Sequence, residues 1–433
     1  MMQLDIPGIT DVLSLIGSHD TRARRSINFT PSENVLSPLA RVPFVSDLYA
    51  RYFFDYFRTS FVSGLDAGRV QMEILEPILR QMARAEYVDV RPMSGMNCAT
   101  IAIAGLCRSG QTMLTVPVEG GGHTSTAAIA DRLGVRTLPV PMRDTHFVDV
   151  ERLDRLIAAE RPALVYFDQS SLLFPADPRP IREVIDRRSP RTVLYVDSSH
   201  TNGLILAGAL PSPLDRGAHA FGGSTHKTLP GPHKGFVATN DPELRDRIAS
   251  IAYHFVSQHH LAAAVSLAIT LIEMRDCGGK EYASRVLENA QRFARGLSDR
   301  GIPVVRTEQG FTRCHQVWVL PPPGTDAAAL SRRLYGQGLL VNLFPDLPGV
   351  SRPVFRMSMA EMTRWGGTER EVDDLVDIFA ELLGAGRDDL RAEVADVKSR
   401  LAKPRYCYDY DQLAAMGVDS GLLSLFQRIE QNA

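Results

Sequence analysis

The first residue of chemical interest is Lys227, within the segment FGGSTHKTLPGPHKGF from Phe221 to Phe236. Only five of the 48 basic residues are lysines, and two of them, Lys227 and Lys234, lie in this segment. Arginine supplies positive charge elsewhere, but it neither releases its proton in proteins nor forms an imine. A lysine kept at this position therefore indicates chemistry at a free amine, although two solvated lysines in an exposed loop would give the same pattern.

The residues around Lys227 favour a phosphate-bearing partner for that amine. The segment is expected to be a loop, and small or hydroxylated residues precede the lysine: Gly222, Gly223, Ser224, Thr225 and His226. Such residues let a phosphate approach backbone N–H groups closely. A lysine among phosphate-binding groups is typical of a Schiff base with pyridoxal phosphate.

Three further clusters have residue types that suit the same cofactor. They are MSGMNCAT (Met93–Thr100), GGGHTST (Gly120–Thr126) and FDQSS (Phe167–Ser171). Ser94 and Gly95 at the start of a helix would cradle a phosphate, His123 would stack on a flat ring, and Ser170 would bond a ring substituent. Each has an ordinary structural alternative, namely a Ser-Gly turn, a structural histidine and a capping serine.

A carboxylate, Asp197, ends another apolar segment in the cluster DSSH, Asp197–His200. Pyridoxal phosphate withdraws electrons well only while its pyridine nitrogen stays protonated, and a carboxylate partner secures that proton. His200 would contact the ring oxygen, the phosphate or the substrate. An aspartate at a strand end, followed about 30 residues later by a lysine, is the order found in pyridoxal phosphate enzymes of the aspartate aminotransferase type.

The elements that must position these residues alternate between strands and helices from Val88 onward. Short apolar segments predict strands in TMLTVPV, VRTLPVP, ALVYF, TVLYVD and GFVAT, and amphipathic helices lie between several of them. This alternation predicts an α/β fold with a mainly parallel sheet covered on both faces. Sites on such sheets gather at the carboxyl ends of the strands, where the polar clusters lie.

The remaining chain suggests four parts. We expect an N-terminal helix and arm (1–35), a large cofactor-binding domain (36–285), a small C-terminal α/β domain (286–385) and a helical tail (386–433). The aromatic segment RYFFDYF, Arg51–Phe57, lies in a stretch interpreted as mostly helical, and it is more typical of packing or a subunit interface than of a site.

Composition excludes several classes of protein. A net charge of −2 without a clustered basic stripe argues against nucleic-acid binding. No segment approaches the roughly 20 apolar residues of a membrane span, and the N-terminus lacks a signal peptide's basic region. Five scattered cysteines without CxxC spacing indicate reduced thiols of a cytoplasmic protein and no metal site.

These motifs together resemble the serine hydroxymethyltransferase family. The residues that carry the resemblance, across about 27–370, are FTPSEN, MSGMN, GGGHTST, VDSSHTNGLILAG, GGSTHKTLPGP and FRMSMAEMTRWGG. The resemblance implies the fold type I of pyridoxal phosphate enzymes, with a seven-stranded sheet in the large domain, and a homodimer with shared active sites.

The resemblance also implies roles for individual residues. Lys227 would form the Schiff base, Asp197 would pair with the pyridine nitrogen and His123 would stack on the ring, so these three are the expected catalytic residues. Further cofactor contacts would come from Ser94, Gly95, Met96, Ser170, His200, Thr225 and His226. The substrate would contact Ser32, Tyr52, Asp55 and Arg356, and Arg356 would hold the carboxylate through its planar fork. Tyr52, or another residue of the aromatic segment, would come from the partner subunit.

The departures from the family concern the folate site. The family's folate-linked glutamate falls on Phe54, and an expected asparagine of a second folate-contacting stretch is Phe344. The residues expected to hold the cofactor are kept, whereas those expected to contact folate are replaced. These replacements put tetrahydrofolate in doubt as a cosubstrate. The motifs DQS, STHKTLPGPHKGF and GFTRCHQV also resemble L-threonine transaldolases of natural-product pathways.

The expected function is therefore an aldol-type transfer between an amino acid and an aldehyde that forms β-hydroxy-α-amino acids. His123, Asp55 or His200 would act as the base on the β-hydroxyl, in a pocket that Phe53, Phe54 and Phe61 keep poorly hydrated. Two alternatives stay open: a serine or α-methylserine hydroxymethyltransferase that uses folate or formaldehyde, and a non-catalytic binding protein with the same fold.

Overall fold

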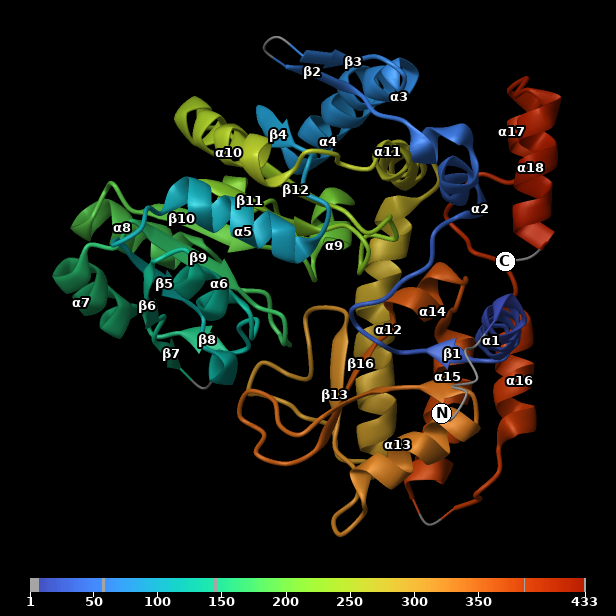
Figure 1. Cartoon of the computed structure of the whole chain (residues 1–433). Coiled ribbons are helices and arrows are strands. Elements are labelled where there is room, and N and C mark those ends of the chain that lie inside the picture. Colours follow the sequence, from blue (N-terminus) through green and yellow to red (C-terminus); the bar gives the residue numbers. More distant parts are fainter. Residues whose placement is uncertain (1–7, 57–58, 144–145, 385, 432–433) are drawn as a thin grey trace, which may run out of the picture.

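A seven-stranded sheet forms the centre of the larger part of the molecule (Figure 1). The structure is a computed structural model that describes residues 8–56, 59–143, 146–384 and 386–431, with the side chains of residues 54–60 left aside. In sheet order the strands are β4 (Tyr87–Asp89), β12 (Gly235–Thr239), β11 (Ala220–Ser224), β10 (Val193–Asp197), β9 (Leu164–Asp168), β5 (Thr112–Thr115) and β6 (Arg136–Pro139). Only β12 runs against its neighbours, so the expected mainly parallel sheet is confirmed.

Alternate strand residues supply the two faces of the sheet, as the period of two in a strand requires. In β9, Leu164 and Tyr166 join the core beneath α5 (Gly95–Leu106) and α10 (Pro242–Phe255). Val165 and Phe167 join the opposite core beneath α7 (Val150–Glu160) and α8 (Arg179–Arg188). Burial on both faces explains why these strands are apolar throughout.

The remaining elements of this part lie around the sheet. A third core, on β11 and β12, is covered by α4 (Glu76–Ala83), α9 (Asn202–Leu206) and α11 (Leu261–Asp276). The others are α2 (Pro38–Arg41), α3 (Leu65–Arg69), α6 (Thr126–Arg132), the strand pair β7 (Met142–Arg143) and β8 (Phe147–Val148), the π-helical turn η3 (Val70–Leu75), and the 3-10 turns η1 (Val42–Val45), η2 (Asp47–Ala50), η4 (Val118–Gly120) and η5 (Leu214–Arg216).

The C-terminal part has its own antiparallel sheet, in the order β13 (Gln316–Val319), β16 (Val354–Ser358) and β15 (Asn342–Phe344). Its core also includes Ile27 and Phe29 of the N-terminal arm, because β1 (Ile27–Asn28) pairs with β14 (Leu339–Leu340). The helices here are α13 (Ala327–Gly336), α14 (Ala360–Arg364), α15 (Glu369–Leu383), α16 (Arg391–Arg400), α17 (Tyr410–Ala415) and α18 (Ser420–Gln431).

One long helix, α12 (Gly279–Asp299), joins the two parts. Its Tyr282 and Val286 pack in the core against β11 and β12, whereas Phe293 and Leu297 pack in the C-terminal core. The expected boundary at residue 285 lies inside this helix, so the division of the chain into domains stays a prediction.

The N-terminal helix α1 (Ile9–Ala23) has no buried residue. Its large apolar side chains are exposed: Ile9 70%, Val12 50%, Leu13 58%, Leu15 71% and Ile16 53%. Of these, Val12, Leu13, Leu15 and Ile16 have the spacing that predicts an apolar face. None of the helices in the described parts of the chain is long and apolar enough to cross a membrane.

Two local expectations need correction. The segment expected as a loop over 221–236 is a β-hairpin whose turn spans 225–234, since Phe221–Ser224 belong to β11 and Gly235 opens β12. Part of the aromatic segment, which was expected in a helical stretch, forms the strand β2 (Phe54–Tyr56), which pairs with β3 (Thr59–Phe61). Aromatic residues favour strands, and this preference prevails over the helical pattern of the residues nearby.

Candidate active site

The turn that carries Lys227 is closed by its own backbone. Thr225 N–H donates to the Lys234 carbonyl at 3.0 Å, and Gly231 N–H donates to the Thr225 carbonyl at 3.0 Å. The hydroxyl of Thr225 donates to the Pro232 carbonyl at 2.6 Å, so it stabilises the turn. Asn34, from the N-terminal arm, donates to the Lys227 carbonyl at 2.6 Å and fixes the turn from outside.

The two lysines of this turn have different surroundings. Lys234 is fully buried, and its Nζ donates to the His259 carbonyl at 2.9 Å, which is a structural contact. Burial lowers the pKa of Lys227 to about 8; the nearby carboxylate of Asp197 opposes this shift and Arg356 adds to it. At neutral pH Lys227 is therefore closer to a free, nucleophilic amine than an exposed lysine is.

Asp197 ends β10 and is held at both oxygens. Tyr166 donates its hydroxyl to Oδ2 at 2.8 Å, and Ser199 N–H donates to Oδ1 at 2.9 Å. Gly223, on the neighbouring strand, has φ +134°, and a Cβ there would lie 2.7 Å from Asp197 Oδ1 and 2.3 Å from Ser199 Oγ. A glycine is thus required at 223 so that β11 can pass close to the carboxylate.

The N-terminus of α5 lies beside β11. Ser94 is the N-cap and accepts from Asn97 N–H at 3.1 Å, which leaves the N–H groups of Gly95 and Met96 at the open end of the helix. A Cβ at Gly95 would lie 3.1 Å from the Ser224 side chain. Ser224 Oγ is buried and has no partner among the described residues. The geometry suits an anion that these groups would share.

His123 lies in the glycine-rich loop after β5, and a buried carboxyl, Asp168, orders that loop. Asp168 accepts from His123 N–H at 3.0 Å, from the Thr126 hydroxyl at 2.6 Å and from the Thr115 hydroxyl at 3.3 Å. Desolvation, and then the charge of Lys227, lower the pKa of His123. Its Nδ1 accepts from Ser125 N–H at 3.2 Å, so the neutral ring carries its proton on Nε2.

Arg356, on β16, is a buried cation. Strand register places Asn342 of β15 opposite it, and the side-chain oxygen Oδ1 of Asn342 accepts from Nε at 3.3 Å and from Nη2 at 3.1 Å. Nη1 donates to the Ser170 carbonyl at 3.0 Å and to Ser171 Oγ at 3.2 Å. All of these acceptors are neutral, and burial lowers the pKa of Arg356 to about 10.

The ring of Phe344 stacks on this guanidinium, 4.5 Å from Arg356 Cζ to the ring centroid. Phe344 is the residue at which an asparagine of the folate-contacting stretch was expected. The departure therefore places an aromatic ring against the arginine that was predicted to hold the substrate carboxylate.

His200 and His226 are both poor bases in this protein. Burial lowers the pKa of His200 well below its usual value, and its ring lies against that of His315 with centroids 5.4 Å apart. Burial lowers the pKa of His226 to about 3, and its ring stacks on His233 at 4.0 Å. His226 Nδ1 is buried and unpartnered within the described part of the chain.

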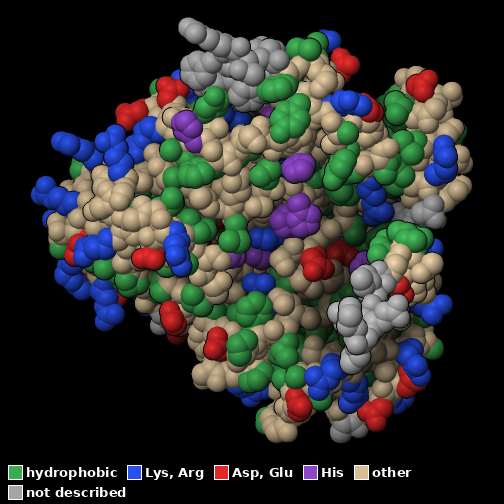
Figure 2. Space-filling view, viewed as in Figure 1, with side chains coloured by type: hydrophobic (Ala, Val, Ile, Leu, Met, Phe, Trp, Pro, Cys, Tyr) green, Lys and Arg blue, Asp and Glu red, His purple; other side chains and the backbone are tan. Residues whose placement is uncertain are grey.

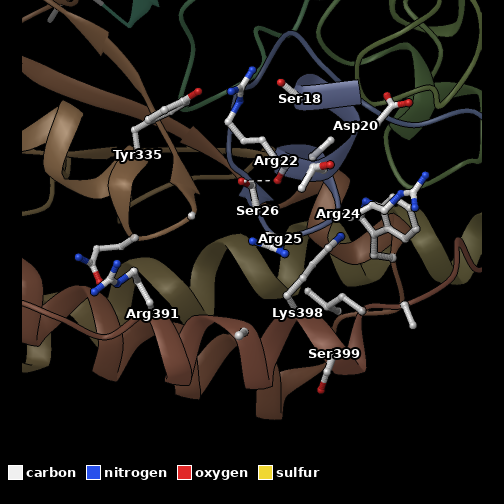
Figure 3. Close-up of a pocket in the computed structure, with 18 of the residues that line it drawn as sticks. Ser18, Asp20, Arg22, Arg24, Arg25, Ser26, Tyr335, Arg391, Lys398 and Ser399 are labelled. Carbon is white, nitrogen blue, oxygen red and sulfur yellow. Dashed lines mark hydrogen bonds between the residues drawn. The ribbon is translucent and has the colours of Figure 1, made fainter. Parts of the chain in front are cut away.

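A cavity of about 870 Å³ joins several of these residues. Ser94 and His226 line it together with Ser32 of the arm, and it is hollowed out near the centre of the face in Figure 2, where histidine side chains gather. A larger cavity of about 1490 Å³ lies between α1, the turn after α13, and α16 (Figure 3). Five arginines line that second cavity, and none of the sequence-predicted site residues does.

Two of the predicted substrate residues, Tyr52 and Asp55, belong to the segment that leads into and forms β2. Tyr52 is exposed and packs on Phe61 with ring centroids 5.6 Å apart. The side chain of Asp55, like that of Phe54, lies outside the described residues. The hairpin that carries them projects from the top of the molecule in Figure 1.

Comparison with known proteins decides the family. The serine hydroxymethyltransferase family matches residues 8–320, which is more than half of the chain. The chain belongs to this family. Members of the family are pyridoxal phosphate-dependent transferases, so the chain is an enzyme of the transferase class and the predicted fold type is confirmed.

Several relatives of the family carry transaldolase names. An L-threonine:uridine-5'-aldehyde transaldolase of Amycolatopsis is 37% identical over 94% of this chain and 99% of its own length. The serine hydroxymethyltransferase of Pyrobaculum neutrophilum is 34% identical over 93% of this chain and 95% of its own. The crystal structure of L-threonine transaldolase from Pseudomonas fluorescens has a TM-score of 0.84 and 26% identity, and covers 98% of both chains.

The residues present fit the family's cofactor. Lys227 offers an amine of lowered pKa, Asp197 offers a fixed carboxylate, and the end of α5 offers N–H groups beside the unpartnered Ser224 hydroxyl. The tight approaches at Gly95 and Gly223 keep these groups close together. The fit rests on this arrangement of donor, acceptor and amine.

Sequence reasoning missed the residues that support this arrangement from other elements. They are Asn34, Tyr166, Asp168, Ser199, His315, Gln316 and Asn342. Several of them lie in motifs quoted above, namely Asn34 in FTPSEN, Ser199 in DSSH, and His315 and Gln316 in GFTRCHQV. Asp168 carried the clearest signal, because it ends the ALVYFD strand in the same register as Asp197 ends β10.

Proposed function

We propose that this enzyme is an L-threonine transaldolase, which cleaves threonine to acetaldehyde and joins the remaining glycyl unit to a second aldehyde. The relatives with 37–40% identity carry this activity in their names, with uridine-5'-aldehyde as the acceptor. The observation that carries the proposal is a buried arginine, Arg356, with only neutral partners among the described residues, beside a lysine of lowered pKa.

Pyridoxal phosphate is the proposed cofactor, and it supplies the electron sink for cleavage of the Cα–Cβ bond. Lys227 would hold it covalently, and the end of α5 with Ser94, Gly95 and Met96 would receive its phosphate. Asp197 would hold the proton of its pyridine nitrogen, and His123 would lie against its ring. Ser170, His200, Thr225 and His226 complete the proposed shell, in which the hydroxyl of Thr225 acts by holding the turn.

Arg356 would orient threonine through the carboxylate, assisted by Ser32, which lines the cavity of about 870 Å³. A buried guanidinium without a carboxylate partner would bind a substrate anion strongly, because folding has already removed the guanidinium from water. His123 carries its neutral proton on Nε2, so it suits stacking better than accepting a proton from the β-hydroxyl. Phe53 and Phe61 would keep water from the reacting carbon.

Replacing Arg356 with lysine tests the carboxylate role. The ammonium keeps the charge but loses the fork of N–H groups, and one charged hydrogen bond is worth about 1.5–3 kcal/mol. We expect the KM for threonine to rise about ten- to hundredfold while kcat changes less. Steady-state kinetics measure this, and an unchanged KM would remove Arg356 from the substrate site.

The lowered pKa of Lys227 predicts the pH dependence of cofactor loading. Only the neutral amine attacks an aldehyde, and burial brings the pKa down to about 8. The loading rate of cofactor-free protein should therefore rise with pH up to about 8 and then level off. Stopped-flow absorbance between about pH 6 and 10 measures this, and a rate that climbs steadily to pH 10 would contradict it.

A homodimer is the proposed assembly. The exposed apolar side chains of α1 and the exposed Tyr52–Phe61 pair are surfaces that a second copy would cover. Tyr52 and Asp55 would then complete the site of the partner. Light scattering of the purified protein checks the mass, and a monomer at micromolar concentration would exclude shared sites.

The decisive experiment incubates the enzyme with threonine and a panel of aldehydes that includes uridine-5'-aldehyde. We expect acetaldehyde release that depends on the acceptor and needs no folate. The second candidate, a serine hydroxymethyltransferase, is favoured by relatives at 32–34% identity, and it predicts serine turnover that depends on folate or formaldehyde. Lack of turnover with every substrate would refute both candidates.

A further inference from the structure

A buried amide, the side chain of Gln316, connects two residues of the site. Gln316 is the first residue of β13 and is fully buried. Its Nε2 donates to the Ser170 carbonyl at 2.9 Å and lies 3.3 Å from His200 Nδ1. The Ser170 carbonyl also accepts a hydrogen bond from Arg356. The Gln316 amide therefore contacts His200, a proposed cofactor residue, and shares the Ser170 carbonyl with Arg356, a proposed substrate residue.

The orientation of the amide is set by its other end. Gln316 Oε1 lies 3.3 Å from Leu172 N and 3.1 Å from Trp318 Nε1. Both of these groups are donors only, so the atom between them must be the oxygen and the atom facing His200 must be the nitrogen.

This orientation of the Gln316 amide selects the tautomer of His200. An amide nitrogen has two hydrogens, of which one goes to Ser170 and the other faces His200 Nδ1. Because that nitrogen can only donate, His200 Nδ1 must accept. Burial keeps the ring neutral, so its single proton resides on Nε2.

The neighbouring His315 does not override this selection. Its Nε2 lies 3.2 Å from the same His200 Nδ1 and can donate or accept, depending on its own tautomer. Gln316 has no such freedom, and a proton on His200 Nδ1 would face the amide hydrogen. With its proton on Nε2, His315 would be a second donor to His200 Nδ1. The backbone carbonyl of Pro31 is a further acceptor for the His315 ring.

We propose that Gln316 is a positioning residue that holds His200 as a hydrogen-bond donor through Nε2–H, toward an anionic oxygen of the bound cofactor or substrate. The nature of that oxygen rests on the proposed function, whereas the form of His200 does not. The His200 ring stays neutral with its proton already on Nε2, so no proton has to move before the oxygen binds.

Gln316→Glu is the sharpest test of this role. The carboxylate keeps an acceptor for Leu172 and Trp318 and removes both donated hydrogens, the one to the Ser170 carbonyl and the one that faces His200. In cofactor-free protein with ¹⁵N-labelled histidine, NMR should show wild-type His200 protonated on Nε2 alone. The variant should show a proton on Nδ1. A His200→Asn spectrum assigns the signals, and Gln309→Glu, at an exposed glutamine, should change nothing.

Loaded enzyme gives the second readout. We expect kcat for threonine to fall about tenfold in Gln316→Glu, as for the loss of one aligned hydrogen bond, with KM nearly unchanged. The pH midpoint of the cofactor absorbance should shift as well. If Gln316→Glu does not fold, Gln316→Met, which also lacks the donor, should give the same loss.

Three results would overturn the proposal. They are a wild-type His200 with its proton on Nδ1, an unchanged His200 in Gln316→Glu, or a change in KM alone. Failure of the proposed function is distinguishable, because an enzyme inactive on threonine would still give the NMR result in its cofactor-free form.

Discussion

Lys227→Ala is expected to lower kcat/KM for threonine by at least about 10³-fold, since a covalent anchor and its amine are both lost. The purified variant should also lack the visible absorbance that the wild-type protein shows with pyridoxal phosphate, near about 420 nm for a protonated lysine-bound form. Activity assays and absorbance spectra of the same preparations measure both effects.

The loss of activity in Lys227→Ala is expected to be large because no other described lysine offers an amine at the position of Lys227. Lys234 is the nearest in sequence, but its Nζ is fully buried and bonded to the His259 carbonyl. Lys227→Arg should be nearly as inactive as the alanine variant, because arginine keeps the charge and forms no imine.

Lys280→Ala is the matched control, because Lys280 is exposed at the start of α12 and far in sequence from the turn. We expect wild-type rate and absorbance from it. Retained activity and absorbance in Lys227→Ala would refute the assignment of the turn as the catalytic centre.

Asp197→Asn is expected to give the second largest effect, a fall in kcat of about 10²- to 10³-fold with a smaller change in KM. The amide has nearly the same shape as the carboxylate. Its oxygen can still accept from Tyr166 or Ser199, so the fold should persist. What is lost is the negative charge that would keep the pyridine nitrogen protonated.

The control for Asp197 is Asp186→Asn, at an exposed carboxylate on α8 that pairs with Arg182. Such surface pairs contribute little, so rates should stay at the wild-type level. Far-ultraviolet circular dichroism would establish that both variants fold. A folded Asp197→Asn protein with wild-type kcat would show that the carboxylate is not the cofactor's partner.

Much of the fold could be predicted because its signals are local. The strands ALVYF and TVLYVD are apolar throughout since both faces of the sheet are covered, and that pattern is readable without coordinates. The hairpin around Lys227 was harder. Gly222 and Gly223 favour a loop by composition, yet they lie in β11, where the opposing strand and Asp197 leave no room for a Cβ and so require glycine.

The supporting residues could not be predicted, because their partners are distant in the chain. Gln316 meets Ser170 across 146 positions and Arg356 meets it across 186. Such contacts depend on how β13 and β16 pack against the loop after β9, and no local pattern encodes this packing. The exposed face of α1 is a related case, since its periodicity predicts a packed helix but not what would cover it.

By itself the sequence determined the family, the α/β class and the lysine, because a scarce residue type in a characteristic motif is a chemical signal that needs no coordinates. Only the tertiary structure decided how that lysine works. It lowered the pKa of Lys227 by burial, left Arg356 without a carboxylate partner and selected the form of His200 through Gln316. These properties arise from desolvation and from hydrogen bonds between distant segments, which exist only once the chain has folded.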